Sequence, residues 1–530
     1  MKLGRLFFNT VFLSGLISLS TFSSAYDSFH VKLNAQLTLS DLGASSGNGC
    51  WGYISESGRE YALMGCDNKV AFVEITDPDN PIYFAFIPHT SSTWADIKVY
   101  KNYCYVVTEA SGSGIQVIDL SLIDNHTVTL VNVVPFPGRS HNVAVDTKSG
   151  FLYTAGSHEG PGTTVCFSLA DPANPVKVGK DSMTENYEHD IMPYTYTAGP
   201  YAGRQILFCS SEDRGVEIYD VTDKNNPFLV KTVTYPNIGY CHQAWMSEDE
   251  KYLYVDDEFD EWIWGYTTRT IVLDVSSLEN AHYVTTFTSG SPAIDHNQYY
   301  RDGFIFQANY TSGLRIFDAN DNPTSPPQVG WFDTYPLGDP VAFEGAWNCF
   351  AFFNSNTVIV SDINRGLFIL DPTEALTRIV VPYDLKLLKG SILSGGLSEL
   401  AFSDDAFLRL RPFALTPPSQ PQVQIEISGT SPSTTPSLLD FDIESATDIS
   451  GIIQTIEILN YETNKWQLLD SRNTSLSDTE VKVSATGNLQ NYVNPADKSV
   501  RIRLSWKAER SSVGLPWTVR VDKAVWDIAP

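Results

Sequence analysis

The sequence predicts an all-β protein, a seven-bladed β-propeller followed by a C-terminal β-sandwich (jelly-roll-like) domain. Three observations support this prediction. A short strand phrase occurs seven times at intervals of about 50 residues, a period typical of propeller blades. A second region lacks this phrase but keeps the alternation of apolar and polar residues that strands show. Neither region contains a long stretch with the helical period.

The repeated phrase places apolar residues before one acidic or polar residue, at the end of the third strand of each unit. The copies are AFVEITDPDNP, GIQVIDLSL, TTVCFSLADPANP, GVEIYDVTDKNNP, RTIVLDVSSLEN, GLRIFDANDNP and GLFILDP. The matching residues are Glu74, Asp119, Ser168, Asp220, Asp274, Asp318 and Asp371. Each unit is long enough for four short strands; in the second unit they read WADIKVY, YCYVVTE, GIQVIDL and LVNVVPF.

The last repeat has no evident fourth strand, whereas a spare strand, VKLNAQLTL, begins at Val31. We expect this strand to complete the seventh blade, because closing the ring hides sheet edges. The repeat stops near 376, and strands such as VQIEISG, GIIQTIEILNY and SVRIRLSW follow it. The sequence therefore predicts a signal peptide over 1–25, a propeller over 26–376 and a sandwich over 377–530.

The first 25 residues have the pattern of a secretory signal peptide. Lys2 and Arg5 precede an apolar run, and Ser24 and Ala25 supply small residues before a cleavage site. We therefore expect an exported protein, extracellular, periplasmic or loosely associated with the cell surface. No later segment offers the ~20 apolar residues of a membrane-spanning helix. The formal net charge of −27 disfavours nucleic acid and anionic membranes as partners.

Seven cysteines in a chain of this length do not indicate a disulfide scaffold. Cys50 and Cys66 lie on strands that are expected to pair, and Cys209 and Cys241 fall at neighbouring strand ends. The spacing leaves open whether either pair forms a disulfide. An odd count leaves at least one thiol free.

Four of the nine histidines occupy one register of the repeat, at the start of the first strand of a blade. That strand lines the central channel of a propeller, so these side chains are expected near one mouth. An amide or an acid follows each histidine. The predicted ligand-binding residues are His141, Asn142, His189, Asp190, His242, Gln243, His296 and Asn297. In an alternative interpretation, each pair hydrogen-bonds the backbone where blades crowd together.

Loops on the same face add acids and aromatic rings. The segment Asp256–Glu261 precedes Trp262 and Trp264, whose rings suit stacking on sugars or contact with a protein. Imidazoles and carboxylates together suit a divalent cation, Ca²⁺ or a transition metal. The candidate cation ligands are His189, His242, Asp256, Asp257 and Glu258. In an alternative interpretation the acidic segment is a solvated loop.

Several phrases resemble a known family. VIDL, VLDV and IYDVTDKNNP resemble the LVIVD repeat. The order GREYALMG, HNVAVD, EHDIMPY, CHQAWMSEDEKYLYVDDE, DHNQYY, NYTSGLRIFD and SDINRGLFIL resembles the choice-of-anchor B family, over roughly residues 30–372. The resemblance implies an exported propeller with a variable C-terminal attachment device. The family has no established enzymatic activity, so the resemblance leaves the function open. This chain has the predicted sandwich domain where such an anchor is expected.

These features favour an exported, non-enzymatic binding or adhesion protein that takes a glycan or protein ligand at the propeller mouth. One alternative is an extracellular lyase or hydrolase that acts on a polysaccharide through channel histidines and acids, with no catalytic residue assigned. Another is a purely structural surface protein.

Overall fold

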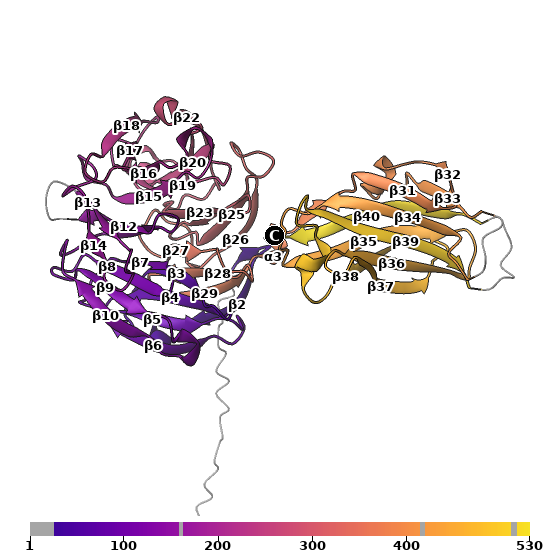
Figure 1. The fold of residues 1–530 in the computed structure, drawn as a ribbon, viewed down its shortest axis with the longest axis horizontal. Helices are drawn as coiled ribbons and strands as arrows, with labels where there is room; N and C mark the ends of the chain where they lie inside the picture. Colours follow the sequence, from indigo (N-terminus) through magenta and orange to yellow (C-terminus); the bar gives the residue numbers. More distant parts are fainter. Residues whose placement is uncertain (1–25, 158–162, 414–418, 510–516) are drawn as a thin grey trace, which may run out of the picture.

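The computed structural model describes residues 26–157, 163–413, 419–509 and 517–530, so the predicted signal peptide lies outside the described residues. Nearly all regular secondary structure of the described chain is β-strand (Figure 1). Its helical segments are short: α1 (Leu39–Leu42), α2 (Asp260–Trp264), α3 (Thr373–Leu376), η1 (Ile123–Asn125), η2 (Gly199–Tyr201), η3 (Leu278–Asn280), η4 (Ser398–Leu400) and η5 (Leu489–Tyr492). No helix in this part of the chain has the length and apolar character needed to cross a membrane.

The N-terminal two-thirds of the described chain form antiparallel sheets that share one four-stranded pattern. Their strands, in chain order and grouped by sheet, are β3 (Gly47–Ile54), β4 (Glu60–Cys66), β5 (Lys69–Glu74) and β6 (Ile82–Pro88); β7 (Ala95–Tyr100), β8 (Tyr103–Thr108), β9 (Ile115–Asp119) and β10 (Thr129–Val134); β11 (Asn142–Asp146), β12 (Phe151–Ser157), β13 (Thr163–Ser168) and β14 (Val176–Lys177); β15 (Asp190–Thr195), β16 (Gln205–Ser210), β17 (Val216–Asp220) and β18 (Phe228–Val233); β19 (Cys241–Met246), β20 (Tyr252–Asp257), β21 (Thr270–Asp274) and β22 (His282–Phe287); β23 (Asn297–Arg301), β24 (Phe304–Ala308), β25 (Leu314–Asp318) and β26 (Gln328–Phe332); and β27 (Ala346–Phe350), β28 (Val358–Asp362) and β29 (Gly366–Asp371).

The first strands of these sheets contact one another in a closed ring, β3–β7–β11–β15–β19–β23–β27 and back to β3. They lie around one centre, and the remaining strands of each sheet lie progressively farther out (Figure 1). The hollows along this central channel are lined by residues of the first strands and the loops beside them. Apolar side chains of neighbouring sheets form the core between them, as where Phe208 and Val255 pack in one cluster. The arrangement is propeller-like.

Two strands from the start of the described chain join the last sheets. β2 (Lys32–Leu37), which contains the spare strand expected from Val31, pairs antiparallel with β29. β1 (Ser28–Phe29) pairs with β26, a contact that the sequence did not predict. The N-terminal segment therefore supplies the outer strand of the β27–β29 sheet and an additional outer strand of the sheet before it.

The repeated residue ends the third strand of every unit. In six units its side chain accepts the backbone N–H two residues on and closes the turn, whereas Glu74 of the first unit pairs with Arg59. The Oδ1 atom of Asp220 accepts the backbone N–H of Thr222 at 2.9 Å, and Asp318 accepts that of Asn320 at 3.0 Å. Such side-chain caps are typical Asx turns. The glycine before the strand has a steric role: at Gly313, with φ of 74°, an added Cβ would lie 2.2 Å from the carbonyl oxygen of Phe332.

The C-terminal region forms two further antiparallel sheets around one apolar core. The sheets contain, in spatial order, β32 (Ser391–Ser394), β33 (Leu408–Arg411), β40 (Val519–Ala529), β35 (Leu438–Thr447) and β38 (Thr479–Ser484), with β30 (Arg378–Val380) also on β40; and β31 (Asp384–Lys389), β34 (Val423–Thr430), β39 (Ser499–Ala508), β36 (Ile452–Asn460) and β37 (Lys465–Asn473). Trp506, Trp517 and Trp526 are fully buried between them.

The two regions meet at the last strand. Asn356 donates hydrogen bonds to Ser437 Oγ, at 2.9 Å, and to the carbonyl oxygen of Pro530. Ala529 and Leu438 also pack against the core of the β23–β29 sheets. The boundary expected near 376 falls at α3, between β29 and β30.

All seven cysteines lie in the described chain as buried free thiols. Cys50 and Cys66 are on the paired strands β3 and β4, but Cys50 lies opposite Met64 and Cys66 lies opposite Gly47. No disulfide forms among the described residues, because the register separates the two candidates.

Candidate functional site

Four histidines stack along one wall of the central channel. His141, His189 and His296 directly precede the first strands β11, β15 and β23, and His242 is the second residue of β19. In the order His141, His189, His242, His296, successive ring centroids lie 4.2, 4.3 and 4.3 Å apart. The shared register therefore brings four imidazoles into a continuous row across four neighbouring sheets. We call this end of the channel the histidine mouth.

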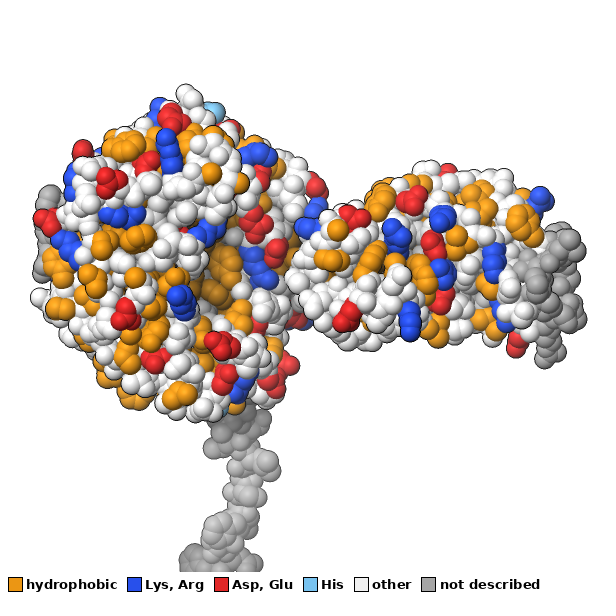
Figure 2. All heavy atoms as spheres, in the orientation of Figure 1, with side chains coloured by type: hydrophobic (Ala, Val, Ile, Leu, Met, Phe, Trp, Pro, Cys, Tyr) orange, Lys and Arg blue, Asp and Glu red, His pale blue; other side chains and the backbone are white. Residues whose placement is uncertain are grey.

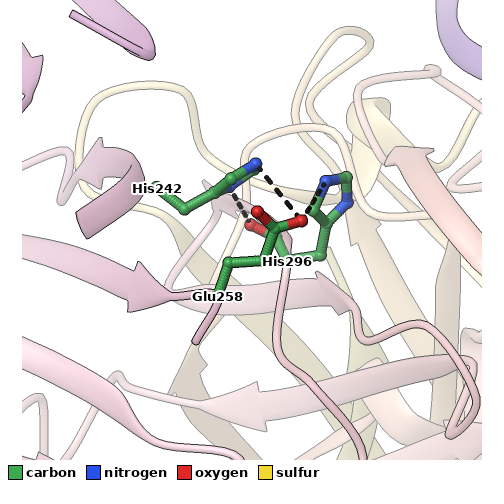
Figure 3. Close-up of side chains that lie close together, drawn as sticks. All are labelled: His242, Glu258 and His296. Carbon is green, nitrogen blue, oxygen red and sulfur yellow. Dashed lines mark hydrogen bonds and ion pairs between the residues drawn. The ribbon is translucent and has the colours of Figure 1, made fainter. Parts of the chain in front are cut away.

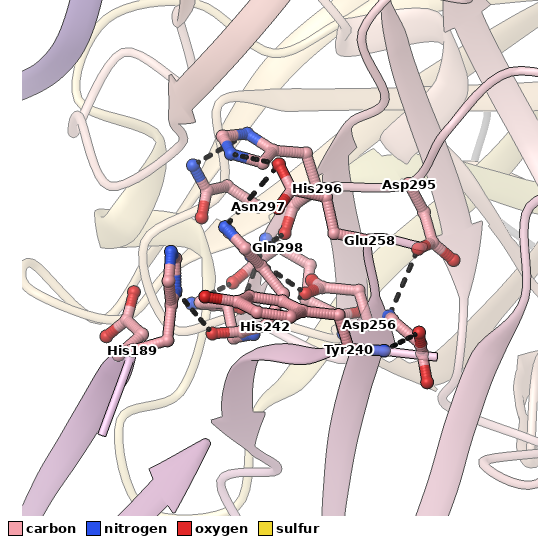
Figure 4. A network of polar contacts seen from close by, with 12 residues as sticks. His189, Tyr240, His242, Asp256, Glu258, Asp295, His296, Asn297 and Gln298 are labelled. Carbon is pink, nitrogen blue, oxygen red and sulfur yellow. Dashed lines mark hydrogen bonds and ion pairs between the residues drawn. The ribbon is translucent and has the colours of Figure 1, made fainter. Parts of the chain in front are cut away.

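Backbone carbonyls of the next sheet set the tautomer of three of these rings (Figure 4). The Nδ1 atom of His189 lies 3.2 Å from the carbonyl oxygen of His242, and Nδ1 of His242 lies 2.9 Å from that of His296. Nδ1 of His296 lies 2.5 Å from the carbonyl oxygen of Trp347. Since a carbonyl oxygen only accepts, each Nδ1 carries the proton, and each neutral ring keeps an unprotonated Nε2.

Burial keeps these three rings neutral. The loss of hydration disfavours the imidazolium, so the pKa of His189 and of His242 lies well below 6.5 and the pKa of His296 falls to about 3. Neighbouring imidazoles lower the pKa further, because adjacent cations would repel each other. This part of the histidine mouth is a row of neutral bases near pH 7.

His141, the first ring of the row, has a different partner. Its Nδ1 lies 2.7 Å from the Oε1 atom of Glu109, a carboxylate rather than a backbone carbonyl. Trp94 packs beside it, with ring centroids 6.3 Å apart. The outer end of the mouth therefore combines an imidazole, an acid and an indole.

The carboxylate of Glu258 lies close to the rings of His242 and His296 (Figure 3). Its Oε1 atom lies 3.9 Å from His242 Nε2 and 3.6 Å from His296 Nε2. The same oxygen accepts a hydrogen bond from the Tyr310 hydroxyl at 2.7 Å. Burial raises the pKa of Glu258 to about 7, although the bond from Tyr310 opposes this shift. His242, His296 and Glu258 offer ligand atoms that all lie within 4.8 Å of one another.

The structure separates the five residues that the sequence proposes as cation ligands. His242 and Glu258 come together, and His296, which the sequence places in the mouth but not among the cation ligands, joins them. Asp256 lies on the other side of the His242 ring, with its Oδ1 atom 3.3 Å from Nδ1. His189 stacks on His242 and is not part of this trio.

Asp257 points away from the imidazoles. Its Oδ2 atom accepts hydrogen bonds from the Tyr235 hydroxyl at 2.9 Å and the Gly239 N–H at 2.8 Å, and its Oδ1 atom accepts the Tyr240 N–H at 2.6 Å. The carboxylate therefore holds the loop before β19 in place. This role corrects the expectation that Asp257 would bind a cation beside Glu258.

The residues that follow the histidines connect neighbouring sheets. Asn142 Nδ2 donates to Asp190 Oδ2 at 2.9 Å, and burial raises the pKa of Asp190 to about 7. Gln243 Nε2 donates to the carbonyl oxygen of Gln298 at 3.0 Å, and Asn297 Nδ2 donates to a carbonyl of the seventh sheet at 2.9 Å. The residues that follow the histidines therefore hydrogen-bond across neighbouring sheets, as one interpretation of the sequence predicts. The Nε2 atoms of the histidines take no part in these bonds and stay available in the channel.

Three hollows follow one another along the channel. The mouth pocket, of about 380 Å³, is bounded by His141, His189, Glu109 and Glu258. Below it, a polar chamber of about 30 Å³ touches all four histidines and has room for a water molecule. The opposite pocket, of about 600 Å³, opens at the other end. Figure 2 shows the propeller-like part hollowed near its centre, with apolar side chains inside.

Seven aromatic side chains line the mouth pocket. They are Trp94, Tyr187, Tyr240, Phe259, Tyr310, Phe343 and Trp347. No lysine or arginine is among its described lining residues. Because the pocket combines ring faces with carboxylates and lacks cations, it suits a neutral hydroxylated ligand better than an anion.

The aromatic wall continues outward onto the surface. The ring of Phe343 lies 5.3 Å from that of Tyr310 and 4.7 Å from that of Trp262, measured between centroids. Trp262, on α2, is 53% exposed. The rings thus form a path from the pocket to the rim, which we call the aromatic path.

The acids of the Asp256–Glu261 segment are buried rather than solvated. Asp260 is fully buried, and Glu261 is 4% exposed. Burial together with neighbouring acids raises the pKa of Glu261 to about 11, so that this carboxyl is protonated at neutral pH. Arg269 supplies a buried positive charge, with its Nε 2.6 Å from Asp260 Oδ2. The interpretation as a solvated acidic loop is therefore wrong.

Sequence reasoning did not identify several residues of the mouth. Tyr310, which holds Glu258, and Phe343, which extends the wall, come from loops of the sixth and seventh units. Tyr310 lies between β24 and β25, a second and a third strand, and bonds Glu258 of the corresponding loop of the preceding sheet. No periodic signal marks Phe343, since its loop lies between two sheets.

No known family model matches the chain, and no curated protein matches it. Among solved structures it is similar to a functionally unknown protein from Desulfotomaculum acetoxidans DSM 771, with 14% identity, a TM-score of 0.41, and coverage of 57% of this chain and 89% of that chain. It is similar to U3-55K at 8% identity and a TM-score of 0.43, covering 64% and 98%. A protein from Lactobacillus plantarum gives 14% identity and a TM-score of 0.39, covering 79% and 95%. These similarities assign no function to the chain.

Proposed function

We propose that this chain is an exported carbohydrate-binding protein, built of a seven-bladed propeller and a C-terminal β-sandwich, that holds a polysaccharide at the histidine mouth. The N-terminal signal pattern supports export. The repeat phrases and histidine dipeptides support a place in the choice-of-anchor B family. The closed ring of first strands supports the propeller, and the paired C-terminal sheets around one core support the sandwich.

The chemistry of the mouth pocket carries the proposal. Sugars present C–H faces that pack on aromatic rings and hydroxyl groups that donate to acceptors. The pocket offers seven aromatic side chains together with the acceptors Glu109, Glu258 and the Nε2 atom of His189. Its volume of about 380 Å³ is within the range of small-ligand sites. The aromatic path supports a chain of sugars rather than a single one.

The test measures binding of neutral polysaccharides and their oligosaccharides to the purified mature protein by calorimetry. We expect at least one to bind, and we expect Phe343→Ala to weaken it about 10-fold, or about 1.4 kcal/mol. Trp264→Ala is the matched control, because Trp264 is 50% exposed on the same helix as Trp262 but does not line the pocket. Its affinity should stay within twofold. Absence of binding to every sugar, or equal loss in both variants, would contradict the proposal.

A second candidate function is cleavage of the bound polysaccharide by a lyase or hydrolase. One observation favours it: the Glu258 carboxyl lines the mouth pocket beside the imidazoles of His242 and His296. Burial also raises its pKa to about 7, which suits a general acid or base at neutral pH. The protein would be incubated with each bound polysaccharide while new reducing ends and unsaturated products are measured. Products that disappear in Glu258→Gln would indicate an enzyme; stable polysaccharide would leave a binding protein.

A further inference from the structure

We propose that His242, His296 and Glu258 bind one divalent transition-metal ion at the floor of the mouth pocket. The inference concerns the same mouth as the proposed function, but it stands on the three side chains alone. Sugar binding is not needed for it.

Three acceptor atoms face one another, and the donor that the structure gives them is the Tyr310 hydroxyl, which bonds Glu258 Oε1. The backbone carbonyls hold the protons of His242 and His296 on Nδ1, so both Nε2 atoms present lone pairs. The Oε1 atom of Glu258 lies 3.9 Å and 3.6 Å from these nitrogens, too far for a hydrogen bond. Lone pairs in this arrangement need an electropositive group among them, and a cation supplies it.

The spacing suits shared coordination. Metal–nitrogen and metal–oxygen bonds of 2.0–2.2 Å place two tetrahedral ligands about 3.4 Å apart. The two nitrogen–oxygen distances are slightly longer, so small side-chain movements suffice to close the site around an ion. The ligands sit on adjacent sheets, with His242 and Glu258 at the ends of β19 and β20 and His296 before β23.

A second layer of hydrogen bonds already orients the ligands. Each ring donates from Nδ1 to a backbone carbonyl, as metal-binding histidines usually do. The Tyr310 hydroxyl holds Glu258 at 2.7 Å. Such preorganisation lowers the cost of assembling the site when the metal arrives.

The ligand set selects the class of metal. Two imidazoles and one carboxylate suit zinc, iron(II) or manganese rather than Ca²⁺ or Mg²⁺, which prefer oxygen ligands. Three protein ligands also leave at least one coordination position open. Glu258 lines the mouth pocket while both histidines line the chamber below, so the open position lies where a sugar oxygen or a water could bind.

The experiment titrates chelator-treated full-length mature protein with Zn²⁺ alone, by calorimetry and by metal analysis after dialysis. We expect one equivalent to bind. His242→Asn and His296→Asn keep an amide donor for the same carbonyls but remove Nε2, and Glu258→Gln keeps the shape of the side chain. Each should weaken binding at least 100-fold, beyond the ~10–100-fold typical of outer-layer partners.

His282→Asn is the matched control, because the exposed His282 also bonds a backbone carbonyl through Nδ1, at 3.1 Å, but lies far out on β22. It should bind Zn²⁺ within threefold of wild type. Thermal unfolding confirms that each variant is folded. If an Asn variant fails to fold, anomalous scattering from Zn²⁺-soaked wild-type crystals tests the position of the ion instead. A peak is expected beside the Nε2 atoms of both histidines.

Failure to bind one equivalent, an anomalous peak elsewhere, or equal loss in the His282 variant would overturn the metal site. The outcome of the metal titration can be distinguished from the outcome of the sugar-binding test. Metal binding without sugar binding would leave this site intact and contradict only the proposed function, and sugar binding by a protein that takes up no Zn²⁺ would do the reverse.

Discussion

Replacing Arg269 with methionine should lower the free energy of unfolding by about 3–5 kcal/mol, the usual cost of removing one partner of a buried ion pair. The guanidinium pairs with Asp260 at 2.6 Å and lies 3.9 Å from Asp257. It also donates to the carbonyl oxygens of Pro236 and Asn237, both at 3.0 Å. Methionine fills similar space but leaves buried acids and carbonyls without their donor.

The same change should also loosen the histidine mouth. The loop that Arg269 holds through Pro236 and Asn237 continues to Tyr240, a wall of the mouth pocket. Arg269→Met is therefore expected to reduce sugar affinity as well as stability. The measurement is urea unfolding followed by calorimetry.

Arg204→Met is the control, because Arg204 is 43% exposed and its carboxylate partners lie 3.7 and 3.8 Å away. Exposed pairs contribute only about 0–1 kcal/mol, so this variant should stay close to wild type. If Arg269→Met lowers the free energy of unfolding by less than about 1 kcal/mol, the prediction is contradicted. The buried acids would then be stable without the Arg269 guanidinium.

Replacing Trp526 with alanine should destabilise the C-terminal region by about 3–5 kcal/mol, because a fully buried indole leaves a cavity that the core fills only in part. Trp526 lies on β40, the strand that pairs with β30, β33 and β35. Its ring packs edge-on against Phe441, with centroids 5.4 Å apart. Calorimetric scanning should show a lowered transition for this region while sugar binding at the histidine mouth is kept.

Trp466→Ala is the matched control, since Trp466 on β37 is only partly buried beneath the Arg503 guanidinium, which lies 4.0 Å from the ring centroid. It should cost about 1–2 kcal/mol. If Trp526→Ala instead lowers every transition together and abolishes sugar binding, the two regions unfold as one unit, contrary to the boundary expected at 376.

The sequence was most informative where the fold repeats. The polar residue that ends each third strand, such as Asp220, caps a turn by itself, so its position depends on local chemistry that a repeat exposes. The spare strand at Val31 was predicted for the same reason, because one unit lacked a fourth strand. The pairing of β1 with β26 was not, since two residues carry no periodic pattern.

The shared register of the histidines could also be predicted from the sequence, but the hydrogen-bond partners of their rings could not. Which carbonyl meets which Nδ1 depends on how neighbouring sheets are offset, and only the structure gives that offset. The same limit explains why Asp257 was expected among cation ligands and His296 was not. Successive residues of a strand point to opposite sides, so Asp257 and Glu258 diverge although they are adjacent.

A proton–nitrogen correlation spectrum of the histidine side chains in metal-free protein tests the central claim most directly. Assigned with the His→Asn variants, His189, His242 and His296 should carry a proton on Nδ1 and none on Nε2, and should stay neutral as the pH falls below 6.5, because burial holds each pKa well below that value. The unfolded chain takes up protons near pH 6.5, so these rings should also make the fold less stable as the pH falls below that value. Protons on Nε2, or charged imidazoles at pH 6, would contradict the account of the histidine mouth as a row of neutral bases that present lone pairs to a ligand.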